Sequence, residues 1–278
     1  MKIIMFVVML LTVTIIFLSI PQSPLKNKYV QEVKTELNQS NFTDEVFTYD
    51  DIKHLPSPVQ RYFEYCGFIG KTKMMNCKFS YDDVDFKMAP DKPSMQINYQ
   101  QYNFVMEPAR VAYIGASMSG IPFEGRDKYE DGKGAMIGVF AKVFTLFDVQ
   151  GKEMDQSGLV TYLAECFLIP NVALQNYITW EAIDDRHAKA TIEWKGKKAS
   201  GIFTFTDNGE MKTFETDDRY MDKGKGVFEK VRWTCEAGEY IETNGIKHPS
   251  VLKAFWNLPE GEYLYFDSRG LTVEYNVK

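Results

Sequence analysis

The sequence predicts a mainly β (α+β) fold: a large curved antiparallel sheet or open half-barrel of about ten to twelve strands with an inserted helix, preceded by an N-terminal transmembrane helix. Three observations lead to this prediction. The chain begins with a long apolar run, its hydrophobic pattern alternates with a period of two from about residue 77 onward, and one central segment has helical spacing instead.

The apolar run covers residues 3–20 (IIMFVVMLLTVTIIFLSI) and contains no charge. About 20 residues of helix cross a bilayer core of roughly 30 Å, so the run is just long enough to span a membrane. A cleaved signal peptide has a shorter apolar region followed by a small-x-small site, and neither is found here. We therefore expect an uncleaved signal anchor in residues 1–26.

The charges beside the run give little information on orientation, because Lys2 and the amino terminus balance Lys26 and Lys28. Orientation then depends on the signal-like position of the run at the start of the chain. We expect a membrane-anchored protein whose main domain is extracytoplasmic, in the periplasm or at the cell surface.

Residues 27–53 are polar and acidic and predict a stalk, helical between Val30 and Leu37. A folded unit begins after it, where Pro58 suits the first turn of a helix over Val59–Tyr65 that ends at Cys66 and Gly67. No internal repeat or low-complexity tract follows. Residues 54–278 are thus expected to form a single β-rich domain.

Alternation is clear in several later segments, for example over residues 189–195, 231–236 and 271–277. This pattern is typical of half-buried antiparallel strands. Turn signals separate the strands, as at Asp207–Gly209 and at Asn244–Gly245.

Two segments interrupt the alternation. Residues 154–176 carry apolar residues at helical spacing up to Pro170 and predict a helix that lies on a sheet face or plugs a barrel. Residues 134–147 have Lys142 as their only charge. This stretch is too short to span a membrane, and we expect either a strand buried on both sides or a mobile apolar flap.

Charge argues against some partners. Residues 27–278 contain 30 basic and 38 acidic residues, a net charge of −8. Binding to nucleic acid or to anionic lipid headgroups favours a basic stripe with interleaved aromatic residues, which this sequence does not have. We expect no nucleic-acid partner, and membrane association only through the N-terminal helix.

The four cysteines, Cys66, Cys77, Cys166 and Cys235, include no Cys-x-x-Cys pair, which argues against a zinc ribbon or a thioredoxin-type site. They are either four buried thiols or, in an oxidising compartment, include a Cys66–Cys77 disulfide.

No catalytic motif is convincing. Residues 115–120 (GASMSG) approach a nucleophile elbow, but Ser119 takes the place of the second glycine. The histidines His54, His187 and His248 have no partner at helical or hairpin spacing, so neither a zinc site nor a histidine-based triad is expected. We assign no catalytic residue, no metal site and no cofactor.

The less ordinary charges are Arg126, Asp127 and Glu165. Asp127 shares a strand face with Phe123 and Tyr129, so it would be carried inward if that face is the core, and a buried carboxylate needs a partner. Glu165 lies on the inserted helix. These charges form either an ordinary salt bridge or a polar anchor for a ligand headgroup in an apolar cavity.

Several segments resemble a known bacterial family of uncharacterised proteins, a domain-of-unknown-function family whose members often carry an N-terminal membrane segment. They are LPSPVQRYF at residues 55–63, RDKYEDGKG at 126–134, YLAE at 162–165, and WNLPEGEY at 256–263. The similarity covers about residue 48 to the end. Members usually carry an arginine where this chain has Thr161. The resemblance implies no activity.

The favoured function is a binding module for an apolar, lipid-like small molecule, because the expected sheet resembles the open half-barrels that carry lipids or lipoprotein acyl chains in bacterial envelopes. The alternatives are an enzyme that uses Asp127 or Glu165 as a base on an apolar envelope metabolite, and a structural or assembly factor at the membrane. The residues expected around the cavity are Arg126, Asp127, Tyr129, Phe140, Phe144, Tyr162, Glu165 and Trp180.

Overall fold

The computed structural model describes residues 1–224 and 226–278. Its helices are α1 (Lys2–Ser19), α2 (Pro24–Gln39), α3 (Tyr49–Ile52), α4 (Ser57–Cys66) and α5 (Lys152–Ala164). A 3-10 turn, η1 (Glu165–Phe167), directly follows α5, and a second, η2 (Val172–Leu174), comes before the next strand. The predicted helix at residues 59–65 is confirmed as part of α4, which ends at Gly67 in the left-handed conformation.

The strands fill the rest of the chain. They are β1 (Asn76–Phe86), β2 (Met95–Phe104), β3 (Ala109–Met118), β4 (Ile121–Glu130), β5 (Lys133–Phe140), β6 (Phe144–Gln150), β7 (Ile178–Ala182), β8 (His187–Trp194), β9 (Lys197–Phe205), β10 (Met211–Thr216), β11 (Tyr220–Asp222), β12 (Phe228–Lys230), β13 (Trp233–Thr243), β14 (Ile246–Leu258), β15 (Gly261–Arg269) and β16 (Thr272–Tyr275).

One antiparallel sheet dominates the fold. Among the described residues it has 14 strands, in the order β6-β5-β4-β3-β2-β1-β15-β14-β13-β10-β9-β8-β7, with β16 paired to β1 beside β15. The predicted fold class is confirmed: a mainly β protein with a large curved antiparallel sheet, an inserted helix and an N-terminal apolar helix. The sheet has a few more strands than expected, because short segments also pair.

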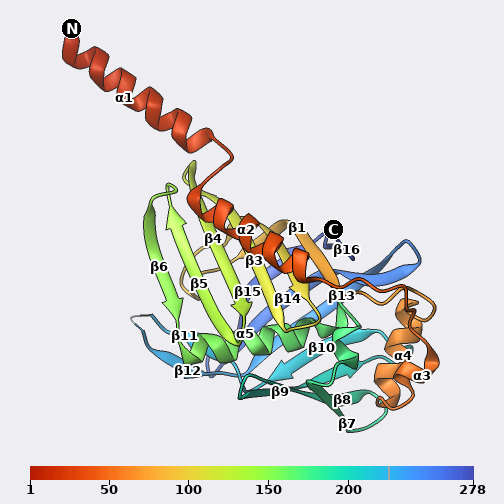
Figure 1. The fold of residues 1–278 in the computed structure, drawn as a ribbon. Coiled ribbons are helices and arrows are strands. Elements are labelled where there is room, and N and C mark those ends of the chain that lie inside the picture. The colour runs from red at the N-terminus through yellow and green to blue at the C-terminus, as the bar shows by residue number, and fades with distance from the viewer. Residues whose placement is uncertain (225) are drawn as a thin grey trace.

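The sheet curves around α5, as Figure 1 shows. We call β1–β6 the first wing and β7–β10 with β13 and β14 the second wing. The chain passes from β6, at one edge of the sheet, through α5 to β7, at the other edge. Helix α5 contacts β4, β5 and β6 on one side and β8 and β9 on the other, so it closes the space between the wings.

Two glycines allow α5 to lie close to the first wing. A Cβ atom on Gly134 of β5 would come within 2.1 Å of the carbonyl oxygen of Met154, and one on Gly158 of α5 within 2.7 Å of the Tyr129 ring. Any larger side chain at these positions would push the helix off the sheet. The inserted helix predicted at residues 154–176 is therefore present, but its regular part is α5 and it ends before Pro170.

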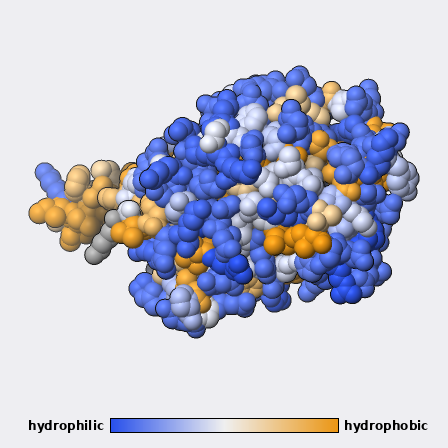
Figure 2. Space-filling model, turned by 90° about the horizontal axis from the view of Figure 1, so that it is seen from below, coloured by the Kyte–Doolittle hydropathy of each residue, from blue (hydrophilic) through white to orange (hydrophobic). Residues whose placement is uncertain are grey.

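The N-terminal helix α1 projects away from the rest of the protein, and none of its residues is buried. Among the described residues it lies in the one helical segment that is long and apolar enough to cross a membrane. Figure 2 shows it as an apolar projection from a largely hydrophilic body. The chain thus carries an N-terminal apolar helix of the kind found in signals and anchors.

Helix α2 corrects the expected picture of a stalk in residues 27–53. Instead of standing free, it packs on the outer face of the first wing, where Tyr29 and Val33 contact Val111 of β3. Leu25, Tyr29, Val33 and Leu37 recur every four residues and form one apolar stripe. Residues 27–53 are polar on average, so their composition alone does not reveal this stripe.

Residues 134–147 also differ from expectation. They do not form one buried strand, but most of the hairpin of β5 and β6 at the edge of the sheet. The turn is made by Ala141 and Lys142, both with positive φ. Along β6, most side chains are exposed.

Candidate ligand-binding site

An aromatic-lined cavity lies inside the curved sheet, between the inner faces of the first wing, α5, and the inner faces of β13, β14 and β15. Its volume is about 180 Å³. For comparison, an engineered apolar cavity of about 150 Å³ binds benzene. The aromatic side chains of the wall are Tyr81, Phe86, Tyr99, Phe167, Trp233, Tyr265 and Phe266.

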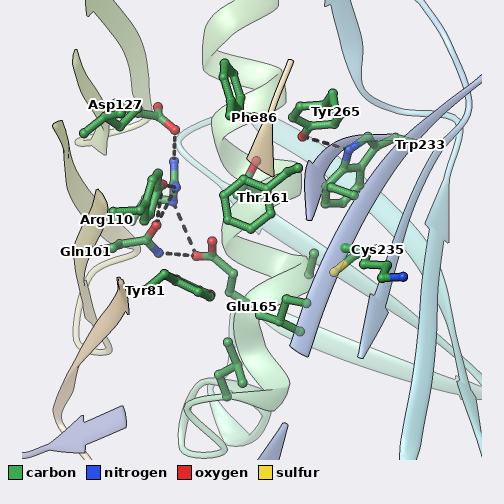
Figure 3. A pocket seen from close by; sticks show the side chains of 18 of the residues that line it. Tyr81, Phe86, Gln101, Arg110, Asp127, Thr161, Glu165, Trp233, Cys235 and Tyr265 are labelled. Atoms are coloured by element: carbon green, nitrogen blue, oxygen red, sulfur yellow. Dashed lines mark hydrogen bonds and ion pairs between the residues drawn. The ribbon is translucent and has the colours of Figure 1, made fainter. Parts of the chain in front are cut away.

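A buried arginine forms the centre of the polar part of the wall. Arg110 of β3 is 2% exposed, and its Nη1 donates a hydrogen bond of 2.7 Å to Asp127 Oδ2. Its Nη2 donates to Gln101 Oε1 at 2.7 Å and to the Tyr99 hydroxyl at 2.9 Å. Figure 3 shows the guanidinium between the two carboxylates of Asp127 and Glu165.

Glu165 completes this group from the end of α5. Its Oε2 accepts hydrogen bonds from Gln101 Nε2 at 2.7 Å and from Asn103 Nδ2 at 2.8 Å, and lies 3.4 Å from Arg110 Nε. Burial alone would lower the pKa of Arg110, but Asp127 and Glu165 outweigh it and raise that pKa well above its ordinary value. The guanidinium therefore stays charged, and its charge is more than balanced by the two carboxylates.

Strand alternation places these side chains together. Tyr99, Gln101 and Asn103 are two residues apart on β2 and face the interior, and Asn103 lies opposite Arg110 on β3. On the next strand, Asp127 lies opposite Ala112. The short Ala112 side chain leaves space through which Arg110 can reach the carboxylate of Asp127.

A second arginine enters the cavity from the segment between β10 and β11. Arg219, just before β11, donates a hydrogen bond to Thr161 Oγ1 of α5. Its guanidinium lies 4.4 Å from the centre of the Trp233 ring and 5.6 Å from that of Trp256, which are cation–π contacts. Its Nε is buried without a hydrogen-bond partner, and Arg219 forms no ion pair with any side chain that the structure describes.

Of the eight residues expected around the cavity, Asp127 and Glu165 line it. The placement of Arg126 needs correction. Its side chain points to the outer face, where Nη1 donates a hydrogen bond of 2.6 Å to Glu32 of α2. The reason is that adjacent residues of a strand point to opposite faces, so Arg126 and Asp127 cannot line the same cavity.

The remaining five expected residues lie elsewhere. Tyr129 is buried beneath α5 against Gly158, and Tyr162 donates a hydrogen bond to the carbonyl oxygen of Phe104 in the core. Trp180 donates to the carbonyl oxygen of Ala173 and packs on Phe203, away from the cavity. Phe140 and Phe144 pair beside the turn of the β5–β6 hairpin.

Sequence reasoning missed Arg110 and Arg219, together with the polar row on β2. The row carries a signal, because residues 98–103 (NYQQYN) place amide and hydroxyl groups on alternate positions of one strand. A strand face with polar residues that is nonetheless buried must satisfy them internally. Neither arginine differs in its local sequence from a surface arginine, so nothing in the sequence identifies them.

The cysteines are all free thiols in this structure. Cys235 lines the cavity, and burial, with a further contribution from Glu165, raises the pKa of its thiol to about 12. Such a thiol is almost fully protonated at neutral pH and is a poor nucleophile. Among the described residues, no three His, Cys, Asp or Glu side chains are grouped so that they could hold a metal ion.

Comparison with known proteins adds the following. Among solved structures, the chain is similar to a LolA superfamily protein from Nitrosomonas europaea, with a TM-score of 0.42 and 12% sequence identity, over 79% of this chain and 92% of that one. No curated protein matches it. The model of a family of unknown function, DUF6544, matches residues 45–268, which is most of the chain and of the sheet. The protein therefore belongs to the DUF6544 family.

Proposed function

We propose that the domain binds an amphiphilic small molecule, with an apolar part in the cavity and an anionic head at Arg219. The observation that carries this proposal is an aromatic-lined cavity that contains one guanidinium with no carboxylate partner among the residues that the structure describes. Ligand pockets typically combine such apolar walls with a few polar groups that fix orientation.

The two arginines have different capacities for a ligand. Arg110 already donates to Asp127, Gln101 and Tyr99, and an added anion would meet the negative charge of two carboxylates. Arg219 donates to one neutral hydroxyl and stacks on Trp233, so its charge is uncompensated within the described residues. A carboxylate or phosphate head gains most at Arg219, where charge-assisted hydrogen bonds are free to form.

Cavity size limits the apolar part. At about 180 Å³ the cavity suits a ring or the end of one acyl chain. A complete lipid with several chains would need the sheet to open, or would leave most of its chains outside. The proposed ligand class is therefore a single-chain or single-ring amphiphile.

The location of the protein is part of the proposal. We infer that α1 anchors the chain in the membrane and that the domain lies outside the cytoplasm, where apolar envelope molecules are at hand. The support is the length and composition of α1 and its place at the start of the chain. Protease treatment of spheroplasts tests this: the domain should be digested from outside, and protection would contradict the orientation.

Two matched probes test the ligand class, 6-bromohexanoate and 6-bromo-1-hexanol. They share a chain length and differ in the anionic head, and bromine quenches the fluorescence of Trp233 in the cavity wall. We expect saturable quenching by both, with the acid bound more tightly. Arg219→Gln should weaken binding of the acid about tenfold and leave binding of the alcohol nearly unchanged, because a charge-assisted hydrogen bond contributes roughly 1.5–3 kcal/mol.

Control variants fill the cavity. Ala254→Phe, with Ala164→Leu as a second choice, adds bulk to the wall and should abolish saturable quenching by both probes while circular dichroism stays native. If the filled variants bind as the wild type does, the cavity proposal fails. If acid and alcohol bind equally and Arg219→Gln changes neither affinity, the proposal of ligand binding in the cavity stands, but the proposal of an anionic head at Arg219 fails.

Identification of the natural ligand needs protein from its own membranes. The full chain and Ala254→Phe are extracted in parallel with a detergent-free copolymer, and the small molecules bound to each are compared by mass spectrometry. A species at about one per chain in the wild type alone supports binding. Identical extracts would contradict it.

A further inference from the structure

The tip of the β5–β6 hairpin combines exposure with apolar character. Val143, Phe144 and Leu146 are 58%, 63% and 52% exposed. Between Gly134 and Phe147 the only charge is Lys142. Soluble surfaces seldom place three large apolar side chains so close together, and such patches usually mark a contact with a partner or a membrane.

Lys142 connects this tip to α1. Although it is a lysine, it is only 5% exposed, and its Nζ donates hydrogen bonds to the carbonyl oxygens of Phe17, at 2.9 Å, and Ile20. It also lies 5.6 Å from the centre of the Phe17 ring. These are the carbonyl groups that a helix leaves unsatisfied at its C-terminus, so Lys142 caps α1.

The cap fixes the depth of the hairpin relative to a bilayer. Helix α1 has 18 residues, which at about 1.5 Å per residue extend about 27 Å, close to the thickness of the hydrocarbon core. Its last turn therefore lies at the boundary between the core and the headgroups. Val143 and Phe144 directly follow the residue that binds this turn, and so they lie at the same level.

We propose that the β5–β6 hairpin tip is a second membrane contact, in which Val143 and Phe144 enter the interfacial layer of the bilayer that holds α1. The favourable free energy comes from removing apolar area from water, about 25 cal/mol for each Å². Lys142 suits this position, because a lysine at the membrane boundary can keep its ammonium among carbonyl and headgroup oxygens. The turn between β5 and β6 then faces the membrane, and the two strands run away from it.

Tryptophan substitutions in the full chain, reconstituted in phosphatidylcholine nanodiscs, test this contact. Phe144→Trp reports on the hairpin tip, and Val143→Trp is a second reporter there. Leu10→Trp reports on the middle of α1. Ile241→Trp is the control, since Ile241 is also an exposed apolar side chain but lies in the β13–β14 hairpin, whose turn contacts Lys71 after α4. Each variant is compared in plain lipid and in lipid brominated near the headgroup.

We expect brominated lipid to remove most of the emission that Phe144→Trp adds to the four native tryptophans, and to leave that of Ile241→Trp unchanged. The proposal depends on α1 being in the bilayer, which Leu10→Trp tests separately with lipid brominated deep in the chain. Quenching at residue 10 with none at residues 143 and 144 overturns the hairpin contact alone. No quenching at residue 10 overturns both the anchor and the contact.

Discussion

Among the individual residues, the charges inside the cavity wall depend closely on their partners. Arg110 is almost fully buried, and its cost of burial is offset by Asp127, Glu165 and the amides of β2. A buried charge of this kind stabilises the fold only while its partners remain. Exposed pairs such as Arg186–Asp207 have no such dependence, because water solvates either partner.

Asp127→Asn should therefore lower the free energy of unfolding by about 3 kcal/mol, the low end for a broken buried pair, since Glu165 remains beside Arg110. Urea unfolding of the full chain in detergent measures the change. The matched control is Asp207→Asn, which removes an exposed carboxylate from a bidentate pair and should change stability little. Equal effects of the two substitutions would contradict the role given to Arg110.

At the scale of elements, the two helices α2 and α5 pack on opposite faces of the first wing. Strands were predictable because alternation is local, and helix α5 because its spacing is local. The docking of α2 was not predicted, although its four-residue stripe is visible in the sequence, because the partner surface on β3 is far away in the chain. The cavity was not predictable for the same reason: which strand face is inner depends on long-range pairing.

Gly134→Ala tests the contact between α5 and β5. The added methyl group would lie 2.1 Å from a backbone oxygen of Met154, so the helix must shift. Overpacking of this kind costs about 1–3 kcal/mol. Gly238→Ala is the control, because a Cβ there meets no atom within 4 Å and its φ is not positive. Thermal unfolding should show a clear loss for Gly134→Ala and almost none for Gly238→Ala.

Docking of α2 should depend on pH. Burial raises the pKa of Glu36 on α2 to about 7, helped by its hydrogen bond with Glu130 of β4 and the charge of Glu107, and opposed by Lys128. The folded chain thus holds a proton that the unfolded chain releases near its ordinary pKa of 4.5. This contribution to stability is complete below about pH 4.5 and is lost as the pH rises through 7.

The difference in unfolding free energy between wild type and Glu36→Gln isolates this proton. The wild type should lose stability relative to Glu36→Gln as the pH rises from 5 to 8, although the lowered pKa of Glu130 offsets part of this loss. Glu64→Gln, at an exposed position of α4, is the control for the loss of a carboxylate elsewhere in the chain. A constant difference for Glu36→Gln would show that the pair does not share a proton.

At the scale of the whole molecule, α5 and two hairpin turns hold the wings together. Asp155 of α5 accepts a hydrogen bond from Gly134 N of β5 at 2.9 Å and forms ion pairs with Lys197 of β9 and with Lys133. Nearby, Asp131 of the β4–β5 turn pairs with Lys195 of the β8–β9 turn at 2.9 Å. Both aspartates lie at the junction between the wings, but Asp155 is buried and Asp131 is exposed.

Asp155→Ala should open this junction. It leaves a buried N–H and loses charge-assisted hydrogen bonds, which costs about 3 kcal/mol. Hydrogen exchange measured by mass spectrometry should become faster in β5, β6 and β9. Asp131→Ala, at the same junction but in water, should leave exchange in these strands unchanged. Uniformly faster exchange over the whole chain would instead mean that Asp155 stabilises the fold globally and does not join the wings specifically.

The strand order also has a consequence for synthesis. Strands β1 to β6 follow one another as a meander, and α2 and α5 can cover its two faces soon after these residues leave the ribosome. The other side of β1, however, is completed only by β15 and β16, the last strands, with Cys77 opposite Tyr275. Until β15 and β16 have been synthesised, one edge of β1 has no partner strand. The nascent chain therefore needs protection at β1, and a chain cut before residue 272 would keep residues 77–80 of β1 without a partner on that side.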